Sequence, residues 1–116
     1  MSLTSQEPLG IEDLNGSRPG QRILRLKGPV VLGTLFQFQS TLRAKDATAL
    51  IIDFTDVPYV DSAGIGALVG AYVTHNKHGR SLSLVGVNQR VRNALIVTRV
   101  ESFFRFFETV ADAENT

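Results

Sequence analysis

The 116-residue chain contains no cysteine and no tryptophan, and its charges nearly cancel. The missing thiols exclude disulfides and cysteine-ligated metal sites, which fits a reducing compartment and leads us to expect a cytoplasmic protein. A net charge of +1, spread along the chain, offers no basic patch to nucleic acid or to an anionic membrane. The longest uncharged apolar run, residues 63–73, is too short to cross a bilayer. We therefore expect no nucleic-acid partner and no direct membrane insertion.

The composition is that of one ordinary globular domain. Hydrophobic residues make up 43% of the chain and charged residues 20%, values typical of a folded protein. The length suits a single hydrophobic core. Residues 1–7 and 111–116 are polar, and we predict that they are frayed tails on either side of a domain at residues 8–110.

Turn signals and hydrophobic patterns predict an α/β fold. The predicted strands cover residues 8–14, 21–27, 49–54, 81–87 and 103–107, and the predicted helices have their N-caps at Thr34, Ser62 and Asn88. Thr34 and Gln37 have the spacing of a capping box, and the continuous apolar run at 49–54 favours a central strand covered on both faces. A hairpin followed by strand–helix units predicts a mixed, mostly parallel sheet of four to five strands.

The predicted helix that begins at Ser62 has no Lys, Arg, Asp or Glu before Lys77. One side of it is an apolar stripe that suits the core: Ile65, Leu68, Val69 and Tyr72. The opposite side collects small and polar residues: Gly66, Ala67, Gly70, Thr74 and Lys77. Each interior glycine costs about 1 kcal/mol of helix stability relative to alanine. Two explanations remain open at this point: the bare side packs under another element, or a partner docks on it.

Three kinds of chemical site fit the same stretch poorly. The glycines of Gly64-x-Gly66 follow a strand, but the next strand ends without an acidic residue to hold a ribose. A serine hydrolase needs a glycine two residues before its nucleophile, whereas Val60 precedes Ser62 at that position. His75 and His78 cannot act as its base, because they lie more than about 15 Å along the helix at about 1.5 Å per residue. Two histidines without a carboxylate also make a poor metal site. We expect no cofactor, no metal and no enzymatic activity.

The segment "LIIDFTDVPYVDSAGIGALVGAY" resembles the signature of STAS domains, in particular those of bacterial anti-sigma factor antagonists. The resemblance continues through "GRSLSLVGVNQRVRNAL" and "TRVESFFRFFE". It implies strands laid out in sequence order with helices mainly on one side. It also implies a phosphorylation-controlled switch in which Ser62 is the phosphoacceptor. The implied partners are an ATP-binding anti-sigma factor with serine kinase activity, which the unphosphorylated protein would sequester, and a phosphoserine phosphatase.

The resemblance and the bare helix side together predict a partner-binding surface. Its residues are Asp61, Ser62, Ala63, Gly64, Gly66, Gly70 and Thr74, with Val31 and Thr34 from the preceding connection. The chain departs from the family pattern in the wholly apolar turn at residues 28–31 and in the short ending "TVADAENT". Two other roles therefore stay open: a scaffold of a stress-signalling complex, or a STAS subunit of a lipid-transport complex. A small nucleotide-binding domain is less favoured.

Overall fold

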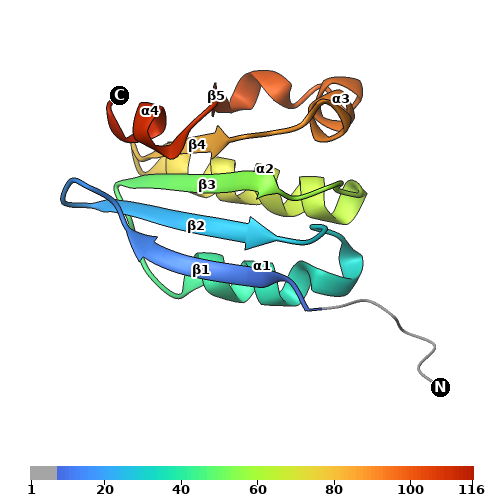
Figure 1. Ribbon diagram of the computed structural model, residues 1–116, viewed down its shortest axis with the longest axis horizontal. Coiled ribbons are helices and arrows are strands. Elements are labelled where there is room, and N and C mark those ends of the chain that lie inside the picture. The colour runs from blue at the N-terminus through green and yellow to red at the C-terminus, as the bar shows by residue number, and fades with distance from the viewer. Residues whose placement is uncertain (1–7) are drawn as a thin grey trace.

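A five-stranded sheet forms the centre of the computed structural model, which describes residues 8–116 (Figure 1). Its strands are β1 (Gly10–Asn15), β2 (Gln21–Lys27), β3 (Ala49–Asp56), β4 (Ser81–Val85) and β5 (Arg105–Phe107). They lie side by side in sequence order, with β1 antiparallel to β2 and every other pair parallel. The predicted mixed, mostly parallel sheet is confirmed, and so is the sequence-order layout that the resemblance implied.

Three helices follow the parallel strands and cover one face of the sheet. They are α1 (Leu35–Arg43), α2 (Ser62–Lys77) and α3 (Gln89–Val97). A 3₁₀ turn, η1 (Leu32–Thr34), precedes α1, and a second, η2 (Glu101–Phe103), precedes β5. Because parallel strands end at the same edge, the N-termini of these three helices gather there, where ligands and partners usually meet α/β folds. Within residues 8–116, no helix has the length and apolar character needed to cross a membrane.

The central strand β3 contributes to the hydrophobic packing on both faces. Leu50, Ile52 and Phe54 are buried towards the helices, in the same cluster as Leu68 of α2. Ile51 points to the opposite face, into a smaller cluster. The expectation of a strand covered on both faces is confirmed, because alternate residues of a strand point to opposite sides.

A short helix, α4 (Val110–Glu114), covers part of the opposite face where we expected a frayed tail. The Thr109 hydroxyl caps it by accepting from Asp112 N at 3.1 Å, and Ala113 is buried. Glu114 holds the helix to the β1–β2 hairpin by accepting from Ser17 N. Small apolar residues in "TVADAENT" therefore fold back on the sheet. The other predicted tail, residues 1–7, lies outside the described residues.

The capping box predicted for Thr34 and Gln37 does not form. Thr34 occupies the N-cap position of α1, but its hydroxyl accepts from Val31 N and donates to Pro29 O at 2.9 Å. The Gln37 side chain instead bonds both backbone groups of Leu9. Thr34 thus binds the loop before the helix and Gln37 binds a segment distant in sequence, so neither side chain closes the predicted box.

Candidate partner-binding site

The N-terminus of α2 is capped by Asp61, and our prediction of Ser62 as the cap is wrong. Asp61 has an extended backbone, and its Oδ1 accepts from Gly64 N at 2.9 Å. Ser62 is the first residue of the helix and is exposed. Aspartate and serine are equally good caps, so two adjacent candidates could not be separated by propensity. The consequence matters for function, because the Ser62 hydroxyl is not needed to cap the helix.

The second carboxylate oxygen of Asp61 joins the start of α2 to the connection before α1. Asp61 Oδ2 accepts from Leu32 N at 3.0 Å, and Asp61 N donates to Val30 O at 3.4 Å. Val30 also forms an isolated parallel bridge with Val60. The loops that follow β2 and β3 are therefore fixed to one another directly beside Ser62.

Gly64 allows these two loops to approach closely. A Cβ atom at this position would lie 2.0 Å from the Val30 carbonyl oxygen, a distance that no real contact shows. Gly64 is buried, so its predicted role in binding a partner reduces to letting the backbones meet. Among the predicted surface residues, Val31 and Thr34 are also buried, at 7% and 2% exposure. They hold the loop in place and are not exposed for direct contact.

Two large apolar side chains stand in solvent beside this junction, and the sequence analysis missed both. Leu32, whose amide binds Asp61, is 71% exposed, and Phe36 in the first turn of α1 is 82% exposed. The sequence did contain a signal for Phe36, because its position falls outside the apolar stripe of Leu35, Phe38 and Leu42 that faces the core. Exposed apolar side chains of this size are a common property of binding surfaces.

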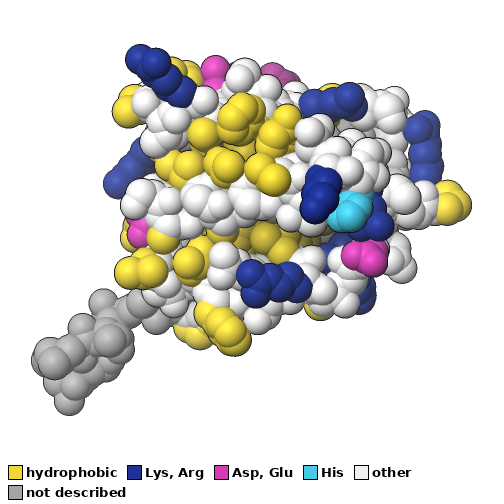
Figure 2. Space-filling view, turned by 180° about the vertical axis from the view of Figure 1, so that it is seen from behind, with side chains coloured by type: hydrophobic (Ala, Val, Ile, Leu, Met, Phe, Trp, Pro, Cys, Tyr) yellow, Lys and Arg dark blue, Asp and Glu magenta, His cyan; other side chains and the backbone are white. Residues whose placement is uncertain are grey.

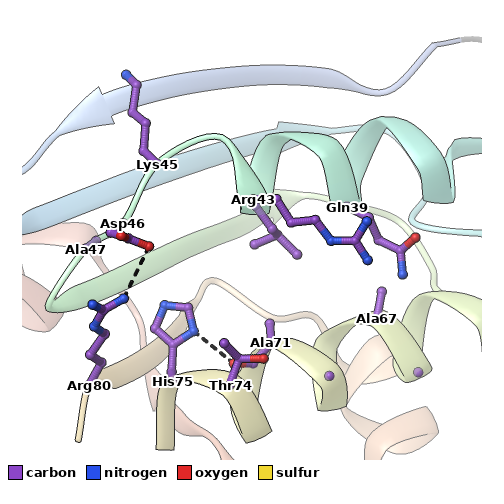
Figure 3. A pocket seen from close by; sticks show the side chains of 13 residues that line it. Gln39, Arg43, Lys45, Asp46, Ala47, Ala67, Ala71, Thr74, His75 and Arg80 are labelled. Carbon is purple, nitrogen blue, oxygen red and sulfur yellow. Dashed lines mark hydrogen bonds and ion pairs between the residues drawn. The ribbon is translucent and has the colours of Figure 1, made fainter. Parts of the chain in front are cut away.

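A groove of about 390 Å³ runs between α1 and α2 on the side of α2 that we predicted to be bare (Figure 3). Gly66 and Gly70 line it, and a Cβ atom at either position would meet no atom of residues 8–116 within 4 Å. The alternative in which another element packs on these glycines is therefore excluded within the described chain. Figure 2 shows the outer surface of α2 as a mostly pale strip across the middle of the view.

The other side of α2 is the predicted core stripe. Ile65 and Leu68 are buried, and Val69 and Tyr72 pack against the same cluster. Towards α3 the stripe continues into a partly exposed aromatic stack, in which the rings of Tyr72 and Phe103 lie 4.9 Å apart. The helix thus has an apolar core side and an outer side that lacks side chains at Gly66 and Gly70 but carries the exposed Val73.

The loop between β3 and α2 is also held from the side of α3. Asn88 caps α3 as predicted, since its Oδ1 accepts from Val91 N at 2.8 Å. Its Nδ2 donates to the carbonyls of Val57 and Pro58, both at 3.2 Å. Arg90 lies over the ring of Tyr59 at 4.8 Å from its centroid. Contacts on both flanks therefore give Ser62 a rigid setting.

A buried arginine fixes the C-terminal end of α1, the helix that forms one side of the groove. Arg22, 5% exposed, donates two hydrogen bonds to the carboxylate of Asp13. It also donates to the carbonyls of Thr41, Leu42 and Lys45 at the C-terminal end of α1. The hydrogen bond from Arg22 holds the pKa of Asp13 below its ordinary value, although burial of the carboxylate opposes the shift. This pair ties β1 and β2 to the end of α1.

Comparison with known proteins identifies one family across most of the chain. The model of the STAS domain family matches residues 16–113. An anti-sigma-B factor antagonist of Listeria monocytogenes is 34% identical over 56 residues, which are 48% of this chain and 49% of that protein. The chain thus spans about half the length of the curated relatives it matches.

Solved structures share the whole fold at low sequence identity. A Thermotoga maritima protein described as a candidate anti-sigma factor antagonist superposes with a TM-score of 0.81 at 17% identity, over 90% of this chain and 92% of that one. The Bacillus cell fate determinant SpoIIAA in its phosphorylated form gives a TM-score of 0.70 at 15% identity, over 92% and 96% of the two chains. At these identities the likeness establishes the fold alone.

Proposed function

We propose that this chain, which belongs to the STAS domain family, is an anti-sigma factor antagonist whose binding is controlled by phosphorylation of Ser62. The observation that carries the proposal is the position of Ser62. It is exposed at the first turn of α2, one turn before the groove residue Gly66, and the loop that leads to it is fixed on both flanks. The curated antagonist that matches half of the chain supports the choice of partner.

Phosphorylation would act on the interface and leave the helix intact. Asp61 already caps α2, so modification of the Ser62 hydroxyl does not remove the helix cap. A phosphate carries about two negative charges, which the positive end of a helix favours. The same dianion would lie beside the Asp61 carboxylate and the apolar Leu32, in a surface that suits a neutral hydroxyl. A partner that buries this surface would have to desolvate the phosphate, which is costly without added cations.

The proposed cycle assigns the chemistry to the partners. An ATP-binding anti-sigma factor with serine kinase activity transfers the phosphoryl group to Ser62, and a phosphoserine phosphatase removes it. The unphosphorylated chain sequesters the anti-sigma factor in the cytoplasm and so frees the sigma factor. In this scheme the chain is a binding protein and needs neither a cofactor nor a catalytic residue of its own.

The test is mass spectrometry after incubation with ATP and the anti-sigma kinase encoded near this chain's gene. The wild-type chain should gain one phosphate and Ser62→Ala none. Ser40→Ala, which removes an exposed serine from α1, is the matched control and should label like wild type. Labelling of Ser62→Ala would refute Ser62 as the acceptor. Absence of any labelling or binding would favour the scaffold or transport-complex role.

Ser62→Asp should weaken binding of the anti-sigma factor while leaving the fold unchanged. An aspartate at the first helical position interacts favourably with the helix dipole, so the free energy of unfolding should change by no more than about 0.5 kcal/mol. Thermal melting and a binding titration on the same preparation check both parts. A parallel loss of stability and binding would mean that the substitution disturbs the Asp61 junction, and the interface argument would fail.

A further inference from the structure

The groove between α1 and α2 has a positive charge bias. Three cationic residues line it, Arg43, Lys45 and Arg80, against the single carboxylate of Asp46, although Figure 3 shows the Lys45 side chain pointing away from the groove towards β1. Two of these cations have acidic neighbours, because Arg80 lies 3.4 Å from Asp46 and Lys45 lies 3.7 Å from Asp13. No carboxylate of residues 8–116 comes within ion-pair distance of Arg43. Its charge faces the groove without compensation from this part of the chain.

Other hydrogen-bonding groups surround Arg43. Figure 3 shows Gln39 and Arg43 reaching from α1 towards α2, where Thr74 and His75 line the opposite wall. His75 Nδ1 lies 2.8 Å from the carbonyl oxygen of Ala71. A carbonyl can only accept, so Nδ1 carries the proton and Nε2 is left for another contact. The groove therefore offers a guanidinium and an amide from α1, and a hydroxyl and an imidazole from α2.

The groove is continuous with the surface around Ser62. Ser62, Gly66, Gly70 and Thr74 are spaced four residues apart and form one ridge of α2, which turns by roughly 120° around the helix axis at about 100° per residue. From Ser62 to Thr74 this row is roughly 18 Å long at about 1.5 Å per residue. The glycines leave it free of side chains, so a chain segment can lie along it against the α2 backbone. Such a segment would contact Ser62 at one end and the Arg43 cluster at the other.

We propose that this groove receives an acidic segment of the anti-sigma factor, with a carboxylate of that segment bound by Arg43. The identity of the partner rests on the proposed function, whereas the acidic chemistry rests on the charges of the groove. Arginine binds carboxylates through two parallel hydrogen bonds, and Gln39 lies one turn away on α1 as a further donor. A neutral or basic segment would bury Arg43 without an ion-pair partner, which is unfavourable.

The first experiment needs no anti-sigma factor. ¹⁵N-labelled protein is titrated with a short alanine-based peptide that contains glutamates, and with the same peptide in which glutamines replace them. We expect the amide signals of Gly66, Gly70 and Thr74 to shift with the glutamate peptide alone, and to stop shifting in Arg43→Glu. Arg105→Glu, at the exposed position of the edge strand β5, should respond like wild type. Equal shifts with the glutamine peptide or with inorganic phosphate, or none with either peptide, would overturn the proposal.

The second experiment uses the anti-sigma factor that labels Ser62. Arg43→Glu should raise its Kd about tenfold or more, while Arg105→Glu should change it less than about twofold. Arg43→Gln, which keeps the length without the charge, should fall between them, and melting curves confirm that each variant folds. Equal effects at positions 43 and 105 would overturn the groove proposal. Normal Ser62 labelling in that case would leave the proposed function standing, whereas peptide binding without any Ser62 labelling would refute the function and keep the groove.

Discussion

Gly64 and Gly70 lie in the same helix, yet their surroundings are opposite. A Cβ atom on Gly64 would lie 2.0 Å from the Val30 carbonyl oxygen, whereas one on Gly70 would meet nothing within 4 Å. Gly64 is needed because two backbones approach each other at the start of α2. Gly70 serves no packing within the described chain, although it costs helix stability. The helix therefore has a rigid end that presents Ser62 and an open wall that a partner can use.

The largest expected effect is on the rigid end. Gly64→Ala should lower the free energy of unfolding by roughly 3 kcal/mol, since overpacking a fixed backbone commonly costs this much. The melting temperature should fall by roughly 10 °C. The damage should spread to the Leu32 loop, because Asp61 links the two loops. Thermal and urea unfolding measure the loss.

Gly66→Ala is the control for this change, two residues away in the same helix. Within residues 8–116 the added methyl group meets no neighbour, so the change should leave the free energy of unfolding unchanged or raise it by up to about 1 kcal/mol through better helix propensity. Similar losses in both variants would show that the two glycines are equivalent. The distinction between a tight junction and an open wall would then be wrong.

The next effect concerns binding at the open wall. Gly70→Lys should fold like wild type or slightly better, because position 70 is exposed and unobstructed. Its long side chain would occupy the groove between α1 and α2, and we expect a loss of about 2 kcal/mol in binding the anti-sigma factor, or roughly 30-fold in Kd. A partner titration beside a melting curve gives both values. Normal folding with normal binding would remove this side of α2 from the interface.

The contrast between the two glycines also shows what the sequence could predict. Local patterns predicted the strands, the core stripe of α2 and the Asn88 cap, because hydrophobic period and capping chemistry are properties of short segments. The capping box at Thr34 failed because backbone groups of the preceding loop at Pro29 and of Leu9, 28 residues before Gln37, bind the two side chains instead. Helix α4 was missed because its few apolar residues gain their partners only from the folded sheet.

The candidate site was predictable in outline only. The bare side of α2 follows from the pattern of residues 62–77 and is present at Gly66, Gly70 and Thr74, whereas Ala67, which the pattern placed on the same side, is buried. The choice of Ser62, which is exposed, came from the resemblance. The sequence could not say which glycine packs and which is open, because that depends on where Val30 lies in space. It also gave no means of placing Arg43 opposite Thr74, since the two belong to different helices. Their role in binding stays a prediction.

The smallest expected effect concerns the end of the α1 wall, where acid should weaken the anchor that Asp13 and Arg22 provide. The folded-state pKa of Asp13 is lowered by the hydrogen bond from Arg22, so the ionised carboxylate stabilises the fold. This contribution is present above the unfolded-state pKa of about 4, and it is lost as the pH falls through the lower folded-state value. Asp13→Asn lacks it at every pH. Wild type should therefore be the more stable protein at pH 7, and the difference should shrink as acid protonates Asp13. Urea unfolding of both proteins from pH 7 to pH 3 measures this.

Because the junction at Gly64 involves no part of this ion pair, Gly64→Ala should lose the same stability across that range. A Gly64→Ala deficit that shrank with acid as the Asp13→Asn difference does would mean that the two ends of the site are coupled, and that the tight junction and the open wall do not behave as separate regions.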